Sequence, residues 1–313
     1  MNHRSLITFF PHLKGASKYR FMKNIIFIFI LSLSLNACSQ SSSTKEPLIR
    51  SANRHGKTSV SKLLSEAKWN ELFPNRHGIN GKIKKNTSVD FYSFKAFVEA
   101  ARYFPEFLSG ESVTQKRELA AFLANIAQET SGGWAEAPGG YFKWGLYFVN
   151  ENEDSTKNTY ADITKKNYPP VTGKSYMGRG PKQLSWNYNY GQFSEAWYGS
   201  KDSLLNHPEY LATDPILSFA SAIWFWMTPQ YPKPSCHNIM NGNWKPTHND
   251  SLKGRIPGFG ATVNVINGGV ECGSGTEMAK TSYRYQYYQC FCKYFKVSPG
   301  ENISCDNQKP FGQ

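Results

Sequence analysis

Apolar side chains recur at helical spacing along much of the chain. Residues 59–67 and 91–104 each place their apolar side chains on one helical face, and Pro105 interrupts the second pattern. A third helix is expected to begin near Thr114, and Gly132-Gly133 is expected to end it. Further apolar or aromatic stretches cover residues 219–227, 261–266 and 277–295, and the last of these is expected to be a helix.

No internal repeat and no series of alternating strands accompanies these helices. The stretch from Glu151 to Pro170 has the composition of a loop, and residues 178–181 form a tight turn signal. A length of 313 residues with 40% hydrophobic side chains is enough for one large domain. We therefore expect a mainly α-helical domain with long loops over residues 59–313.

Residues 22–38 have the pattern of an export signal. Lys23 supplies the positive charge, residues 25–35 form the apolar region, and the small Ala37 precedes Cys38. The apolar region is too short for a transmembrane helix. The pattern therefore predicts export.

The residues 35–38 resemble the lipobox of bacterial lipoproteins, which implies lipidation of Cys38 and a membrane anchor. We therefore expect residues 1–38 to be a signal segment, with Met22 as the start, and residues 39–58 to be a flexible tether. A plain signal peptide with cleavage nearby is the alternative.

Charge and cysteine content exclude several classes of function. The formal charge is +13, but Lys and Arg are spread along the chain without a dense basic run, so nucleic acid is not an expected partner. Neither zinc-ligand spacing nor a phosphate-binding loop occurs, so no metal and no cofactor is expected. We also expect a monomer. Besides Cys38, five cysteines remain, and an odd number leaves at least one thiol unpaired. A nucleophilic pair of Cys236 with His237 is not favoured, because adjacent residues rarely form such a dyad.

Two glutamates lie in contrasting settings. Glu129 closes the apolar helix predicted from Thr114, one turn beyond Ile126 on its buried face. Burial and the helix C-terminus both disfavour a negative charge, which suits a proton donor. Glu151 follows the aromatic side chains of the run YFKWGLYFVNE (141–151), lies in a polar loop and should be ionised. One donor and one acceptor are what hydrolysis of a glycosidic bond needs, although each could instead be a solvated surface residue.

Polar and aromatic side chains alternate in the segment QLSWNYNYG (183–191). Amides and hydroxyls bind sugar hydroxyls, and aromatic rings stack on sugar faces. A loop or strand without a binding role is the alternative for this segment.

The chain resembles the glycoside hydrolase family 19 chitinases. The resemblance extends over roughly residues 59–311, and its most specific segments are QKRELAAFLANIAQETSGGW (115–134), SYMGRGPKQLSWNYNYG (175–191) and GRIPGFGATVNVINGGVECG (254–273). It implies a lysozyme-like, two-lobed α-helical domain with a central cleft. It also implies an inverting endochitinase that cuts β-1,4 bonds between N-acetylglucosamine units.

The resemblance also implies roles for individual residues. Glu129 matches the general acid, Glu151 the general base, and Ser185 the residue that helps to hold the attacking water. The other matched positions are substrate contacts (Gln183, Asn189, Lys233, Asn267), a cleft-lining residue (Tyr176), a charged network that orients the acid (Glu271, Arg284) and a disulfide (Cys272, Cys305).

The chain departs from the family pattern at several positions. Gln128 stands where the family usually has a histidine, which removes a titrating neighbour of the acid. Cys292 matches a cysteine often left free. Cys236 and Cys290 have no counterpart, and their pairing with each other is left open.

Two other functions compete with the chitinase interpretation. A muramidase that cleaves peptidoglycan shares the fold, and a cell-envelope anchor would suit it. A chitin-binding protein without activity is the third possibility, and the presence of both glutamates argues against it. The full 183–191 and 266–273 motifs favour chitin.

Overall fold

The computed structural model describes residues 49, 57–78, 90–134, 136–151, 159–275 and 279–313. The expected signal segment, the lipidation site Cys38 and nearly all of the expected tether lie outside the described residues. Residues 46–313 form one compact unit. No helix in the described part of the chain is both long and apolar enough to cross a membrane.

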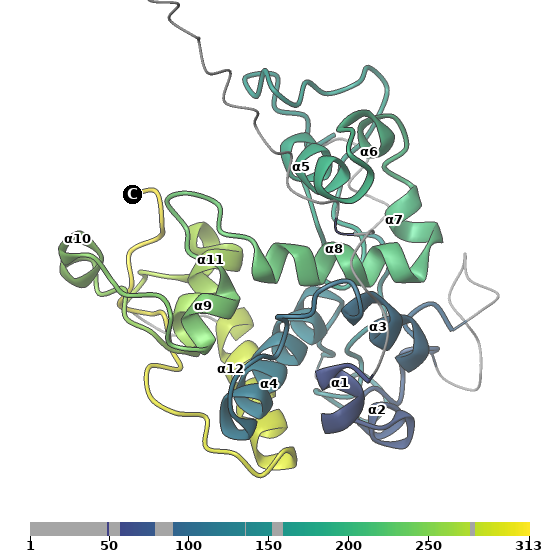
Figure 1. Ribbon diagram of the computed structural model, residues 1–313. Coiled ribbons are helices and arrows are strands. Elements are labelled where there is room, and N and C mark those ends of the chain that lie inside the picture. The colour runs from purple at the N-terminus through teal and green to yellow at the C-terminus, as the bar shows by residue number, and fades with distance from the viewer. Residues whose placement is uncertain (1–48, 50–56, 79–89, 135, 152–158, 276–278) are drawn as a thin grey trace, which may run out of the picture. The chain divides into compact units, whose positions relative to one another are not determined.

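The described residues are mainly helical, as the sequence pattern predicts, and their β-structure consists of isolated bridges. The helices are α1 (Ser59–Leu63), α2 (Glu66–Leu72), α3 (Phe94–Ala101), α4 (Ser112–Glu129), α5 (Asn187–Tyr198), α6 (Asp202–Asn206), α7 (Tyr210–Thr213), α8 (Pro215–Met227), α9 (Cys236–Met240), α10 (His248–Leu252), α11 (Phe259–Glu271) and α12 (Ala279–Tyr294) (Figure 1).

Polar side chains fix where many of these helices begin. At each of six helix starts, a side-chain oxygen accepts a hydrogen bond from a first-turn backbone N–H, which would otherwise lack a partner. The residues that provide these caps are Thr58, Ser65, Ser93, Asp214, Ser235 and Thr247.

Helix α4 runs through the core, since every residue from Glu118 to Ala127 is buried. It lies beside α12, and α3 packs against α8 (Figure 1). Phe122 of α4 stacks on Phe97 at 5.7 Å between ring centroids and meets the edge of Trp226 at 5.5 Å. Each such aromatic pair adds about 0.5–1.5 kcal/mol beyond the burial of its area. This packing fixes α4, and with it the position of Glu129.

Helix α11 contains the apolar stretch 261–266 and continues through Gly268 and Gly269. The helix extends to Glu271, and Asn267 breaks its regular geometry with φ −144° and ψ 30°. A Cβ on Gly268 would lie 2.2 Å from Oδ1 of Asn264, so glycine is needed there for close packing. Helix α11 is therefore kinked at Asn267, and Glu271 after the kink is buried.

Candidate active site

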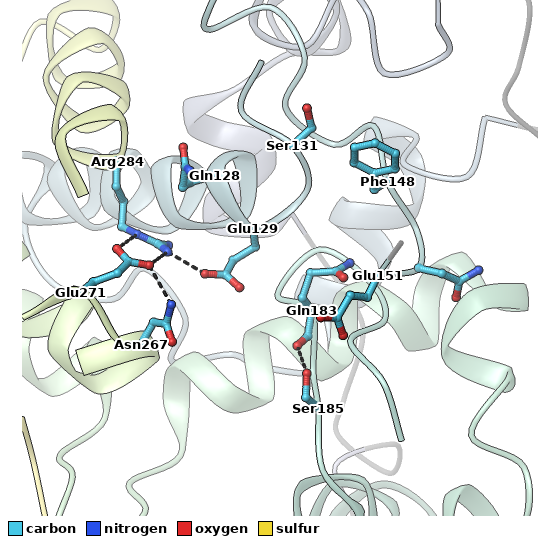
Figure 2. A pocket seen from close by; sticks show the side chains of 11 residues that line it. Gln128, Glu129, Ser131, Phe148, Glu151, Gln183, Ser185, Asn267, Glu271 and Arg284 are labelled. Carbon is cyan, nitrogen blue, oxygen red and sulfur yellow. Dashed lines mark hydrogen bonds and ion pairs between the residues drawn. The ribbon is translucent and has the colours of Figure 1, made fainter. Parts of the chain in front are cut away.

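A cavity of about 480 Å³ brings together residues from distant parts of the chain (Figure 2). It is lined by Gln128, Glu129, Ser131, Phe148, Asn150, Glu151, Gln183, Ser185, Asn267, Glu271 and Arg284. Seven of the site residues expected from the sequence are in this set: Glu129, Glu151, Gln183, Ser185, Asn267, Glu271 and Arg284.

Glu129 is the last residue of α4, and a local hydrogen-bond network fixes the chain at that point. The hydroxyl of Thr130 donates to the carbonyl of Ile126 at 2.6 Å and accepts from the backbone N–H of Leu146 at 2.7 Å. The helix end is thereby tied to the loop that leads to Glu151. Gly132 follows with φ 71°, a left-handed conformation that glycine adopts without strain.

Two cations face the carboxylate of Glu129. Nη2 of Arg284 donates to its Oε1 at 2.7 Å, and Nζ of Lys182 lies 3.8 Å from its Oε2. The side chain is 15% exposed. The sequence predicts a dry, apolar surrounding for Glu129, and this prediction is wrong in one respect. The helix delivers the side chain out of the apolar core into a cluster of charges, and nearby cations favour the ionised form.

Arg284 holds two carboxylates at once. Its guanidinium is 2% exposed and donates to both oxygens of Glu271, at 2.6 and 3.1 Å, and to Oδ1 of Asn125 at 3.0 Å. Burial acts to lower the pKa of Arg284, but Glu129 and Glu271 outweigh it and hold the pKa above its usual value. Because one guanidinium serves two carboxylates, Arg284 keeps an ion-pair partner when either one is protonated.

Asn267 completes this side of the cavity. Its Nδ2 donates to Oε1 of Glu271 at 2.8 Å, one turn further along α11. The kink at Asn267 places both side chains at the cavity wall, on the same side as Arg284 (Figure 2).

Glu151 lies on the other side, with Gln183 and Ser185 (Figure 2). Its Oε1 accepts from the hydroxyl of Tyr160 at 2.6 Å, and its Oε2 accepts from the backbone N–H of Gly178 at 3.1 Å. Burial, and then the hydrogen bond and charge of Glu151, raise the pKa of Tyr160 to about 12. A Cβ on Gly178 would lie 2.9 Å from Oε1 of Gln183 and 3.3 Å from Oγ of Ser185, so a larger residue there would displace the Gln183 side chain.

The turn that carries Gln183 and Ser185 has an unusual backbone. Gln183 has φ 51°, its Nε2 donates to the carbonyl of Gly180 at 2.9 Å, and its carbonyl accepts from the hydroxyl of Ser185 at 2.9 Å. Trp186, which follows, has φ 77° and precedes α5. A positive φ at a bulky residue is uncommon and costs on the order of 1–3 kcal/mol. The surrounding packing therefore holds this turn in a conformation that faces Ser185 to the cavity.

Three expected site residues lie outside the cavity. Tyr176 was expected to line the cleft, but it is 0% exposed, and its hydroxyl donates to the carbonyl of Leu205 and accepts from the N–H of Val171. It therefore packs in the core behind the site. Nζ of Lys233 donates to the carbonyl of Val265, and Nδ2 of Asn189 donates to that of Ser185. Lys233 thus contacts the backbone of α11, and Asn189 that of the lining residue Ser185.

Sequence reasoning missed the lining residues Ser131, Phe148 and Asn150 and three residues that contact the charged side chains of the site. Lys182 and Asn125 contact the charged cluster, and Tyr160 holds Glu151. Lys182 could have been found from its position, because it lies directly before Gln183 in the segment 175–191. Asn125 stands one turn before Glu129 on α4, and Tyr160 has no local signal.

Cys272 and Cys305 form a disulfide, as expected, with 5.1 Å between their Cα atoms. The bond ties the end of α11, and therefore Glu271, to the C-terminal segment. Cys236, Cys290 and Cys292 are free, and because Cys236 is buried and Cys290 is exposed, the pairing left open above does not form. Nowhere in the described ranges do three or more His, Cys, Asp or Glu side chains cluster in a way that could hold a metal ion.

Chemically, three carboxyl groups line the cavity, and two of them, Glu129 and Glu151, have separate partners. Glu151 is oriented by a hydroxyl and a backbone N–H, beside the hydroxyl of Ser185. Glu129 is oriented by Arg284, whose charge is shared with Glu271. In this arrangement, Glu151 can accept a proton from a water molecule on its side of the cavity. Glu129 can donate a proton to a departing oxygen on the other side.

Comparisons with known proteins agree on one family. A family model described as chitinase class I, glycoside hydrolase family 19, matches residues 64–305. The chain is 43% identical over 260 residues to endochitinase A2 of Pisum sativum, which covers 82% of this chain and 76% of that protein. It is 47% identical over 223 residues to chitinase 1 of Oryza sativa subsp. japonica, and this match covers 71% of this chain and 68% of that protein.

Solved structures give the same result. Chitinase C from Streptomyces griseus HUT6037 matches with a TM-score of 0.59 and 30% identity, and the match covers 78% of this chain and 97% of that one. A family GH19, class IV chitinase from Zea mays matches with a TM-score of 0.56 and 29% identity, covering 79% and 99%.

Proposed function

This chain belongs to glycoside hydrolase family 19, so it is a chitin-cleaving glycoside hydrolase, and we propose that Glu129 is its general acid and Glu151 its general base. Its substrate is chitin or a related N-acetylglucosamine polysaccharide, which it cuts internally. The fold is the lysozyme-like helical fold of that family. The observation that carries the proposal is that both glutamates line one cavity from opposite sides with different partners (Figure 2).

We propose that Glu151 takes a proton from the attacking water. The hydroxyl of Tyr160 and the N–H of Gly178 orient its two oxygens, and the hydroxyl of Ser185 lies in the same wall, where it can help to hold the water. The water attacks the anomeric carbon from the face opposite the departing sugar, which inverts the configuration.

Glu129 then donates its proton to the glycosidic oxygen as that bond breaks. The charge network makes this role compatible with two nearby cations. When Glu129 is protonated, Arg284 remains paired with Glu271 through two hydrogen bonds, so the proton leaves no orphaned charge at Arg284. A bound sugar also excludes water from the cavity, which favours the neutral form of a carboxyl group.

Polar side chains along the cavity suit the hydroxyl and acetamido groups of the substrate. We propose Gln183 and Asn267 as direct contacts, since both line the cavity. Lys233 and Asn189 remain proposed contacts of a longer substrate, although each is hydrogen-bonded to the wall here.

The proposed mechanism is tested by the anomer of the first product. Proton nuclear magnetic resonance during hydrolysis of a chitin hexamer should show the α-anomer at the newly formed reducing ends before mutarotation, because the substrate is β-linked. Internal cutting should give dimers to tetramers from the start. A β-anomer as first product would exclude the mechanism. Peptidoglycan assayed in parallel is the control, since the comparisons are with chitinases and do not favour the muramidase alternative.

We further propose that the chain is exported and anchored through a lipid on Cys38. The sequence of residues 22–38 supports export, and the Cys272–Cys305 disulfide is typical of an oxidising compartment. Acyl chains bind membranes with about 0.8 kcal/mol for each buried CH₂ group, so two or more chains anchor stably.

Replacing Cys38 with Ser should move the protein from the membrane fraction to the soluble fraction, or stall its processing. Its activity on chitin oligomers should not change, because the substitution lies far along the chain from the cavity residues. Membrane fractionation and the mass of the mature N-terminus measure the effect. If the variant stays in the membrane fraction at low salt and leaves it at high salt, adhesion of a basic surface explains the location instead.

A further inference from the structure

Lys182 is held close to the proposed acid by the fold. It follows the turn at Gly180, which has φ 77°, and its side chain is 10% exposed. Its Nζ lies 4.7 Å from the ring centroid of Phe225 in α8 and 3.8 Å from Oε2 of Glu129. Such contact with an aromatic face stabilises a partly desolvated ammonium group. The lysine is therefore packed in place rather than extended into solvent.

Two further titratable side chains lie near Lys182. Lys233 and Cys236 interact with it electrostatically. Lys233 is a cation, and burial raises the pKa of the Cys236 thiol, so that thiol is neutral at neutral pH. Among the carboxyl groups that line the cavity, Lys182 forms an ion pair with Glu129.

The two cations beside Glu129 differ in what they can do. Arg284 shares its charge between Glu129 and Glu271, and it contacts both oxygens of Glu271. Lys182 forms an ion pair with Glu129, at 3.8 Å between Nζ and Oε2. A change in the protonation of Glu129 therefore alters the pairing of Lys182 more than that of Arg284.

We propose that Lys182 is a positioning residue that holds the Glu129 carboxylate by the oxygen that Arg284 does not contact, and that it sets the pH above which that carboxyl group stays unprotonated. The inference rests on the proposed role of Glu129 as general acid and adds a residue that acts through it. Lys182 need not touch the substrate to act in this way.

The sign of the effect follows from the charge. A cation beside a carboxyl group favours the ionised form, and an opposite charge within about 4–6 Å lowers a carboxyl pKa by roughly 1 to 3. A general acid must be protonated in the free enzyme, so kcat/KM falls as pH rises past the point where the acid ionises. Removing the cation should move this alkaline limb to higher pH.

The test compares three substitutions in the full-length protein. Lys182→Met removes the charge and keeps a chain that can pack on Phe225, whereas Lys182→Arg keeps the charge. Lys166→Met removes the same charge from an exposed position. With a chitin hexamer as substrate, the alkaline limb of the kcat/KM profile should move to higher pH by about 1 unit in Lys182→Met. It should stay at the pH of the native sequence in the other two variants.

A second measurement separates this inference from the acid assignment. The side-chain carboxyl carbon of Glu129, identified by its absence in Glu129→Gln, is titrated by nuclear magnetic resonance in the native sequence and in Lys182→Met. An unchanged titration midpoint for Glu129 overturns the role of Lys182, whatever the activity shows. A midpoint that rises while the alkaline limb stays in place supports the coupling of Lys182 to Glu129 and overturns Glu129 as the acid. Melting temperatures of the variants show that each is folded.

Discussion

Replacing Glu129 with Gln is expected to reduce hydrolysis of chitin oligomers by about 10²–10⁴-fold. A sugar alkoxide is a poor leaving group, so its departure depends on the proton that Glu129 supplies. The fold should persist, because glutamine has nearly the same shape and its amide oxygen can still accept from Arg284, which also stays paired with Glu271. Initial rates and melting temperature measure the two effects.

The control is the exposed Glu136, whose replacement by Gln removes the same charge outside the cavity and should leave the rate unchanged. An oligomer with a nitrophenyl leaving group gives a sharper comparison, because a nitrophenolate leaves without protonation. The loss in Glu129→Gln should be much smaller on that substrate. A near-normal rate on plain oligomers would remove Glu129 from the mechanism.

Replacing Glu151 with Gln should cause a loss of similar size on both kinds of substrate. The base activates water, and that need does not depend on the leaving group. The two glutamates are therefore distinguished by their response to the nitrophenyl substrate rather than by the size of their effects.

Azide can attack without a base, so it provides a second criterion for Glu151. Addition of azide to Glu151→Ala should restore turnover and give a glycosyl azide with inverted configuration, whereas it should not help Glu129→Gln on plain oligomers. Tyr160→Phe is the matched control, since it removes the hydroxyl that orients Glu151 but keeps the base, and its loss should be smaller. Full activity of Glu151→Gln would contradict the assignment.

Particular elements show where local sequence was sufficient. The apolar pattern before Glu129 corresponds to α4, and the glycines after it mark the end of that helix. The aromatic stretch from residue 277 corresponds to α12. In each case many residues within a few turns point to the same structure, so the local signal is strong.

Other elements depended on contacts that local patterns do not contain. The polar, aromatic segment 187–191 is the first part of α5 rather than a loop or strand, because packing overrides its weak helical pattern. Tyr176 is in the core because its hydroxyl finds a carbonyl from Leu205, 29 positions away. The kink at Asn267 arises where Gly268 must approach Asn264 closely.

The sequence by itself determined the helical class and the two glutamates with their neighbouring polar motifs, because periodicity, capping and motif spacing are local properties of the chain. The tertiary structure alone decided what faces each glutamate. Arg284 reaches Glu129 across 155 positions, and Lys182 arrives from a turn beyond Glu151. Charges that far apart in sequence meet only through packing, and their distances set the proton affinity of a carboxyl group. For this reason the structure places two cations beside Glu129, where the sequence predicted an apolar surrounding.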